Sequence, residues 1–334
     1  MKKIVCFLLL FLSFVLFPFL PVNDKTQVVS LREQSPNTVS PHYPVVVDTY
    51  DAKGVPMQTT FQRAPQRIIV DEVNALETLL ILGQGERIVG AALSTAGVSY
   101  ARLQGEYPEE FAKVEPVIQN AIGREQAVAL QPDFILAWKA SFTPRWYGNT
   151  AWWQERGVNT YVIATANHVL KDATVEDECK FIDDMGRIFD RKEQTDALLR
   201  DIRAELRVDE ETMRGREQQT VLIVEVGEGD ILNYDEGWVV GDMVRRLGGR
   251  IPLTSKYIGE EELISCDPDV IFVTYNDAYG KQFAENFFRA VRFNSLHAVQ
   301  NNRIHFVPVE YVYTPAFKLL EGIRAIRRGL YPDE

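Results

Sequence analysis

The sequence predicts an α/β fold with two Rossmann-like lobes, each a mainly parallel sheet with flanking helices, joined by a long rigid α-helix. Three observations lead to this fold class. Short apolar runs alternate with helical patterns in both halves of the chain, as in parallel sheets that are buried on both faces. A helical turn, a Pro-Asp corner and an apolar strand occur once in each half, at residues 130–138 and 266–274. A helical stretch without strand patterns separates the halves.

The N-terminal lobe is expected over residues 43–170. Two β-rich runs flank the turn residues Asp51 to Gly54 and predict a hairpin. The apolar runs that follow predict buried strands, and runs with helical spacing predict helices, two of which end at Gly83 and Gly157. The strands are expected at residues 68–70, 87–92, 134–138 and 161–164, and the helices at residues 74–82, 124–130 and 152–156.

Residues 171–214 are expected to form the helical segment between the lobes. Apolar side chains recur at helical spacing from Val175 to Phe189 and again from Ala197 to Leu206, with charges at the other positions. The second helix is predicted over residues 192–214, where it would extend for roughly 35 Å at about 1.5 Å per residue. A helix of this length would bridge the two lobes.

Alternation of strands and helices then resumes and predicts a C-terminal lobe over residues 215–334. Short apolar runs and amphipathic stretches again follow one another. Gly248 and Gly249 end one of the helices, and a Pro-Asp corner precedes one of the strands. The strands are expected at residues 220–226, 270–274 and 303–308, and the helices at residues 241–247, 260–265, 283–290 and 316–330.

Residues 1–22 predict an export signal peptide or a membrane anchor. Two lysines precede a nearly unbroken apolar run, the order found in export signals. The run is close to the roughly 20 residues that span a bilayer, so cleavage and retention both remain open. Residues 23–42 are polar and predict a flexible linker. The chain is therefore expected in the periplasm or on the outer face of the cytoplasmic membrane.

Composition and motifs exclude several classes of function. A net charge of -11 argues against a nucleic-acid binder, which needs a basic surface. No nucleophile elbow, P-loop, zinc-protease motif or dinucleotide fingerprint is present, so no enzyme is predicted. Scattered histidines and the lack of Cys-x-x-Cys predict no cofactor and no metal site. Cys179 and Cys266 could pair in an oxidising compartment, but we favour two buried, unpaired side chains.

The ligand-binding candidates follow the predicted strands, because the carboxyl ends of parallel strands form the cleft in folds of this class. Aromatic rings there suit a large organic ligand, since they offer contact area with few torsions to freeze. Packing within a lobe is an equal alternative for each ring. Lys139, or Arg145 nearby, could pair with an anionic group. The candidates are Trp138, Lys139, Trp146, Tyr147, Tyr234, Trp238, Tyr275, Tyr279, Tyr311 and Tyr313.

An ordered set of segments resembles one class of periplasmic binding proteins. This class serves ferric siderophores, haem and cobalamin and has a rigid helix between its lobes. The resemblance runs from about Tyr43 to the end of the chain, and the order and spacing of its motifs make it specific at the level of the family. The segments are APQRIIV at 64–70, NALETLLILGQGERIVG at 74–90, LQPDFILA at 130–137, EELISCDPDVIFV at 261–273, FNSLHAVQNNRIHFVP at 293–308 and LYP at 330–332.

The resemblance implies the substrate-binding component of an ABC importer. Such a protein, expected as a monomer, would capture a ferric siderophore, haem or cobalamin between its lobes and deliver it to a permease with its ATPase. It also implies an acidic permease-docking residue on each lobe. Glu77 matches the first, and Asp242 and Glu261 are candidates for the second, although Arg245 stands where an acidic residue is expected. A membrane-tethered ligand-sensing module of the same fold is the alternative function.

Overall fold

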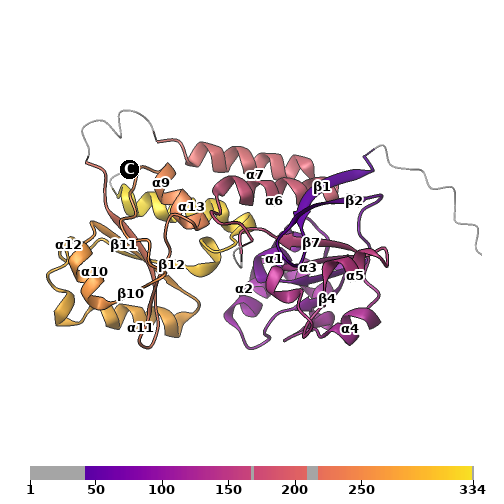
Figure 1. The fold of residues 1–334 in the computed structure, drawn as a ribbon, viewed down its shortest axis with the longest axis horizontal. Coiled ribbons are helices and arrows are strands. Elements are labelled where there is room, and N and C mark those ends of the chain that lie inside the picture. Colours follow the sequence, from indigo (N-terminus) through magenta and orange to yellow (C-terminus); the bar gives the residue numbers. More distant parts are fainter. Residues whose placement is uncertain (1–41, 167–168, 209–216, 333–334) are drawn as a thin grey trace, which may run out of the picture. The chain divides into compact units, whose positions relative to one another are not determined.

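The computed structural model describes residues 42–166, 169–208 and 217–332 (Figure 1). The predicted signal peptide or anchor at residues 1–22 and nearly all of the linker at 23–42 lie outside the described residues. Within those ranges, no helix has both the length and the apolar character needed to cross a membrane.

The N-terminal lobe contains a fully parallel five-stranded sheet with the order β5-β4-β3-β6-β7. The predicted hairpin precedes it as the antiparallel pair β1 (Val45–Tyr50) and β2 (Pro56–Phe61). The sheet strands are β3 (Ile68–Asp71), β4 (Ile88–Ala92), β5 (Ile118–Gln119), β6 (Phe134–Trp138) and β7 (Asn159–Ile163). The helices are α1 (Val73–Ile81), α2 (Val98–Glu106), α3 (Pro108–Val114), α4 (Arg124–Ala129) and α5 (Thr150–Gln154), with 3₁₀ turns η1 (Gly85–Arg87), η2 (Glu115–Val117) and η3 (Lys139–Ser141).

The C-terminal lobe contains a second five-stranded sheet with the order β10-β9-β8-β11-β12. Strands β8, β11 and β12 are parallel, and β9 and β10 add an antiparallel edge that the sequence patterns did not predict. The strands are β8 (Val221–Val226), β9 (Ile231–Asn233), β10 (Tyr257–Ile258), β11 (Val270–Tyr275) and β12 (Ile304–Pro308). The helices are α9 (Val239–Arg246), α10 (Glu260–Cys266), α11 (Ala278–Phe288), α12 (His297–Gln300) and α13 (Leu319–Leu330), with 3₁₀ turns η4 (Val291–Phe293), η5 (Val309–Tyr311) and η6 (Ala316–Lys318).

Both sheets are buried on both faces, which explains why their strands are continuous apolar runs. In β6, Phe134 and Leu136 join one core cluster, while Ile135 and Ala137 join another on the opposite face. Strand β11 divides in the same way between two clusters. The two-lobed α/β fold class is therefore confirmed.

Two helices connect the lobes, as the two helical runs predicted, but the second is shorter than the long helix predicted over residues 192–214. Helix α6 (Val175–Ile188) and helix α7 (Lys192–Glu205) have 14 residues each and pack side by side after a turn at Asp190, whose φ is 52° (Figure 1). The described second helix therefore extends about 21 Å instead of roughly 35 Å. The part of that prediction that covers residues 209–214 lies outside the described residues.

Helix α6 contacts both lobes. At its beginning, the Val175 N–H donates to the carboxylate of Asp242 in the C-terminal lobe, at 3.0 Å. At its end, the hydroxyl of Tyr43 donates to the Ile188 carbonyl at 2.7 Å. Gly186 lets α7 approach closely, because a Cβ there would lie 2.1 Å from Thr195 Oγ1. The helix pair therefore fixes the spacing of the lobes over the length of α6.

The two described cysteines are both free, as favoured, but only Cys179 is buried as predicted. Cys179 is buried in α6, and this burial raises the pKa of its thiol to about 12. Cys266 lies half-buried at the end of α10 in the C-terminal lobe. Neither thiol is therefore poised to react as a thiolate near neutral pH.

Candidate functional site

A cavity of about 620 Å³ lies between the two lobes, at the carboxyl ends of their parallel strands. Its lining includes residues that follow β3, β11 and β12, together with Trp138 at the end of β6 and Glu225 near the end of β8. Parallel strands end at the same edge of a sheet, and here the ends of both sheets meet. The lining residues are Glu72, Val73, Asn74, Ala96, Gly97, Val98, Ser99, Trp138, Glu225, Leu232, Tyr234, Trp238, Lys256, Tyr257, Asn276, Asp277, Val309, Glu310, Tyr313 and Thr314.

Four aromatic side chains of the cavity form a contiguous group, which we call the aromatic set: Trp138, Tyr234, Trp238 and Tyr313. The ring centroid of Tyr313 lies 6.1 Å from that of Trp138 and 5.6 Å from that of Trp238. The Tyr234 ring lies edge-on to Trp238 at 5.2 Å. Because Trp138 comes from the N-terminal lobe and the other three come from the C-terminal lobe, the aromatic set spans both walls of the cavity.

Glu225 places a carboxylate at the cavity wall. The Tyr234 hydroxyl donates to one of its oxygens at 2.8 Å, and the Asn276 side-chain amide donates to the other at 2.9 Å. Both donors are neutral, so they orient the carboxylate without cancelling its charge. Burial and the neighbouring Glu225 raise the pKa of Tyr234 above its ordinary value, which keeps this hydroxyl protonated.

Glu72 is a second carboxyl group at the cavity and caps the N-terminus of α1. It accepts hydrogen bonds from the backbone N–H groups of Asn74 at 2.9 Å and Ala75 at 2.5 Å. Those bonds favour the charged form, but burial outweighs them and raises the pKa of Glu72 to about 8, with Glu178 and Glu310 adding to the effect. Glu72 is therefore mostly protonated at pH 7.

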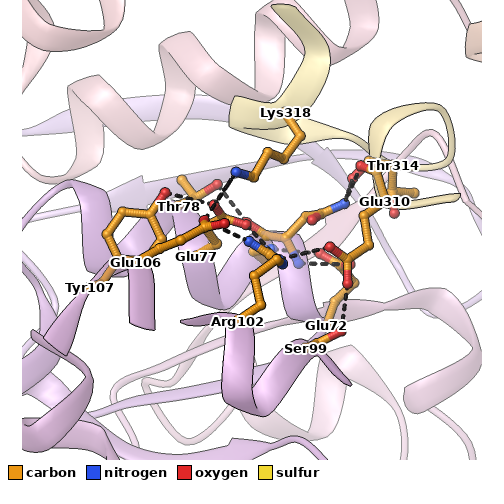
Figure 2. Close-up of polar contacts among 12 residues, drawn as sticks. Glu72, Glu77, Thr78, Ser99, Arg102, Glu106, Tyr107, Glu310, Thr314 and Lys318 are labelled. Carbon is orange, nitrogen blue, oxygen red and sulfur yellow. Dashed lines mark hydrogen bonds and ion pairs between the residues drawn. The ribbon is translucent and has the colours of Figure 1, made fainter. Parts of the chain in front are cut away.

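An ion-pair network joins the two lobes beside the cavity (Figure 2). Arg102 of α2 contacts Glu310 of the C-terminal lobe at 2.8 Å and Glu77 of α1 at 2.9 Å. Lys318 of η6 reaches back across the junction to Glu77 at 3.0 Å and to Glu106 at 3.2 Å. In this network, basic and acidic side chains from one lobe therefore pair directly with side chains of opposite charge from the other lobe.

Hydrogen bonds reinforce the same junction. The Asn74 side-chain amide donates to the backbone carbonyls of Glu310 and Thr314, both at 3.0 Å. The Ser99 hydroxyl donates to the Glu310 carboxylate at 2.5 Å (Figure 2). The cleft wall that follows β12 is therefore tied to α1 and α2 of the opposite lobe.

Comparison with known proteins identifies the family of this two-lobed cleft. Residues 68–311 match the periplasmic binding protein family. The chain belongs to this family. It is 22% identical over 309 residues to an uncharacterized ABC transporter substrate-binding lipoprotein, YvrC, of Bacillus subtilis, and the match covers 87% of each protein.

Solved structures share the fold of this periplasmic binding protein. A periplasmic binding protein from Veillonella parvula has a TM-score of 0.79 at 25% identity, covering 87% of this chain and 92% of that one. An ABC-type Fe3+-hydroxamate transport system from Saccharomonospora viridis has a TM-score of 0.64 at 19% identity, covering 86% and 99%. The predicted family is thus confirmed, and the chain is an ABC transporter substrate-binding protein, which is not an enzyme. Such proteins act outside the cytoplasm, consistent with the predicted export.

Of the ten predicted cleft residues, the four of the aromatic set line the cavity of this periplasmic binding protein. Tyr147 is buried in the core of the N-terminal lobe, 1% exposed, beside Phe142. Tyr279 points away from the protein on α11, where it is 73% exposed. Lys139, Trp146, Tyr275 and Tyr311 are half-buried outside the cavity lining. The burial of Tyr147 contradicts its placement in the cleft, because strand ends predict an edge of the sheet but not which way each loop turns.

Two of the three predicted docking residues lack the accessibility that docking requires. Glu77 is 1% exposed and bonded within the inter-lobe network, where Tyr107 also donates to it at 2.7 Å. Asp242 is 2% exposed and pairs with Arg245 and, at 2.7 Å, with Arg246. Interpreting both as surface acids was therefore wrong: each carboxylate is itself buried and pairs with neighbouring basic side chains. Glu261 is exposed in the first turn of α10.

The polar cavity residues Glu72, Glu225 and Glu310 were not predicted, because the sequence criteria selected aromatic side chains. The signal was present: Glu72 and Glu310 stand within two residues after the ends of β3 and β12, and Glu225 is the next-to-last residue of β8. Lys256 and Tyr257 were missed for another reason, since they come from the unpredicted β9–β10 edge. Among the described residues, no group of three or more His, Cys, Asp or Glu side chains is arranged to hold a metal ion.

Proposed function

We propose that this periplasmic binding protein captures a bulky metal chelate in the inter-lobe cavity and delivers it to the permease of an ABC importer. The proposed ligand belongs to one of three classes of chelate: ferric siderophores, haem or cobalamin. The observation that carries the proposal is the cavity itself, whose volume of about 620 Å³ lies within the range of pockets that enclose drug-sized organic molecules.

The aromatic set supports an organic ligand over a small polar solute. Three of its four rings are half-buried, which leaves part of each available for contact with a ligand, while Tyr234 is 3% exposed. Aromatic rings give large contact areas at low cost in side-chain entropy. The helix pair α6–α7 and the inter-lobe network hold the two walls together, which suits a ligand that enters a largely preformed cleft.

Isothermal titration of the purified chain with a ferric hydroxamate, a ferric catecholate, haem and cobalamin tests the binding. We expect one of these to bind with a dissociation constant near 1 μM or lower. Trp238→Ala should weaken that binding at least tenfold, because Trp238 contacts two other rings of the aromatic set. The matched control is Trp152→Ala on α5, a tryptophan outside the cavity lining. Equal affinities of both variants would contradict the proposed site.

Delivery to the permease requires an exposed surface, and we propose that Glu261 contributes to it. Helix α10 begins with three successive glutamates, of which Glu260 pairs with Arg292 at 2.5 Å and Glu261 is exposed. An exposed carboxylate can meet a basic partner without losing an internal bond. We propose that the protein works as a monomer, so that one copy presents its cleft to one permease.

A further inference from the structure

We propose that the cavity selects chelates that carry a positive charge, such as an ammonium group, over neutral and anionic chelates. This inference rests on the proposed function and names the charge class of its ligand. It is drawn from the charges, the rings and the unpaired polar atoms of the lining.

The charged side chains of the lining are predominantly acidic. The lining contains four acidic residues, of which Glu72 is mostly protonated at pH 7 and the other three are Glu225, Asp277 and Glu310. Among the described residues, it contains one basic residue, Lys256, and no arginine. Of these acids, Glu310 is paired with Arg102, and Asp277 bonds a backbone N–H at 2.7 Å as the N-cap of α11. A polyanionic chelate is held best by arginine and lysine groups, and this lining offers it one lysine.

Glu225 is the carboxylate most suited to a cationic ligand. Its contacts with Tyr234 and Asn276 hold its position but leave its negative charge uncompensated. Tyr234 also contacts the ring of Trp238, so the carboxylate stands next to the aromatic set. A carboxylate beside aromatic rings is an arrangement that attracts an organic cation, by its charge and by the negative faces of the rings.

Unpaired atoms of the lining also match such a ligand. Asn74 and Thr314 are each 2% exposed, and Asn74 Oδ1 and Thr314 Oγ1 have no hydrogen-bond partner within the part of the chain that the structure describes. Asn74 Oδ1 only accepts hydrogen bonds, so it calls for a donor such as an ammonium N–H. Trp138 Nε1 is an unpaired donor and calls for an acceptor such as an amide or hydroxamate carbonyl. A chelate with both amide carbonyls and an ammonium group carries the kinds of acceptor and donor that these atoms lack.

Chelates that differ only in charge test the inference. Ferrioxamine B carries a terminal ammonium, its N-acetyl derivative is neutral there, and its N-succinyl derivative is anionic. A second series carries the same three terminal groups, the free ammonium, the N-acetyl and the N-succinyl group, on an aminohexyl arm of cobalamin. Haem and a ferric tricatecholate are tested as further anionic chelates. We expect the cationic form to bind about tenfold tighter than the acetylated form on the scaffold that binds, with the succinylated form weakest.

The variant Glu225→Gln removes the charge and keeps the shape. It should reduce the tenfold preference to about twofold while leaving affinity for the acetylated form nearly unchanged. The matched control is Glu109→Gln, an exposed glutamate on α3 outside the cavity, which should keep the preference.

The possible outcomes separate the inference from the proposed function. Tightest binding by haem, the tricatecholate or a succinylated derivative overturns the inference and leaves chelate capture standing. Equal affinities across a charge series, or a preference that Glu225→Gln does not change, also overturn the inference alone. Failure of every chelate to bind overturns both the inference and the proposed function.

Discussion

Replacing Glu77 by alanine should destabilise the protein instead of removing a docking contact. The buried carboxylate binds Arg102 at 2.9 Å, Lys318 at 3.0 Å and Tyr107 at 2.7 Å. Removing one partner of a buried ion pair costs about 3–5 kcal/mol when the other charge is left alone. Here Arg102 keeps Glu106 and Glu310, and Lys318 keeps Glu106. We therefore expect Glu77→Ala to lower the free energy of unfolding by about 2–3 kcal/mol.

Urea denaturation followed by circular dichroism measures this loss, with Glu77→Gln as the second variant. Glutamine keeps the volume and an acceptor for Tyr107 but not the charge, so its loss should be smaller, about 1–2 kcal/mol. At a temperature where both variants remain folded, uptake through the permease should match the wild type. A loss below about 0.5 kcal/mol, together with reduced uptake by fully folded protein, would refute this reasoning and restore the docking role.

Three further predictions follow from the structure. Gly186→Ala should lower the melting temperature, because the new Cβ would lie 2.1 Å from Thr195 Oγ1, and Thr195→Ala in the same chain should recover part of the loss; additive losses in scanning calorimetry would disprove this contact. Burial raises the pKa of Glu72 to about 8 and that of Glu178 to about 7, so the folded protein retains protons that the unfolded chain releases near pH 4.5. The free energy of unfolding should therefore fall between about pH 5 and pH 8, by up to about 1.4 kcal/mol per pH unit for each group, and Glu72→Gln should flatten that slope; a variant with the wild-type slope would exclude Glu72 as a cause. Glu261→Lys should reduce uptake and leave chelate affinity unchanged, which transport and titration assays on the same variant compare; normal uptake would remove Glu261 from the docking surface.

Much of the fold could be predicted because buried parallel strands leave a strong signal. Strand β6 was predicted with the bounds that the structure shows, and β3 and β12 were predicted to within one residue at each end. The edge strands β9 and β10 were missed because they have three and two residues, too few for a periodic pattern. The inter-lobe segment was predicted as helical, but the predicted long second helix was wrong, since helical spacing alone does not show where a helix ends.

The site could be predicted only in part. Trp138, Tyr234, Trp238 and Tyr313 were placed correctly at the cavity because they lie at or after strand ends. Tyr147 satisfies the same rule, yet its loop folds back and buries it in the N-terminal core. The difference between a ring that faces the cleft and one that faces the core depends on loop conformation, which has no periodic signature in sequence.

The sequence by itself determined the two-lobed α/β fold, the family and the edge of each sheet that would form the cleft. Hydrophobic period and the order of motifs carry that information locally along the chain. Only the tertiary structure decided which carboxylates are buried and which are available. Helix α1 is buried from Asn74 to Leu80, so Glu77 faces the opposite lobe instead of solvent. The charge of a side chain is local to its residue, but its exposure and partners depend on elements hundreds of residues away, such as Glu310 and Lys318.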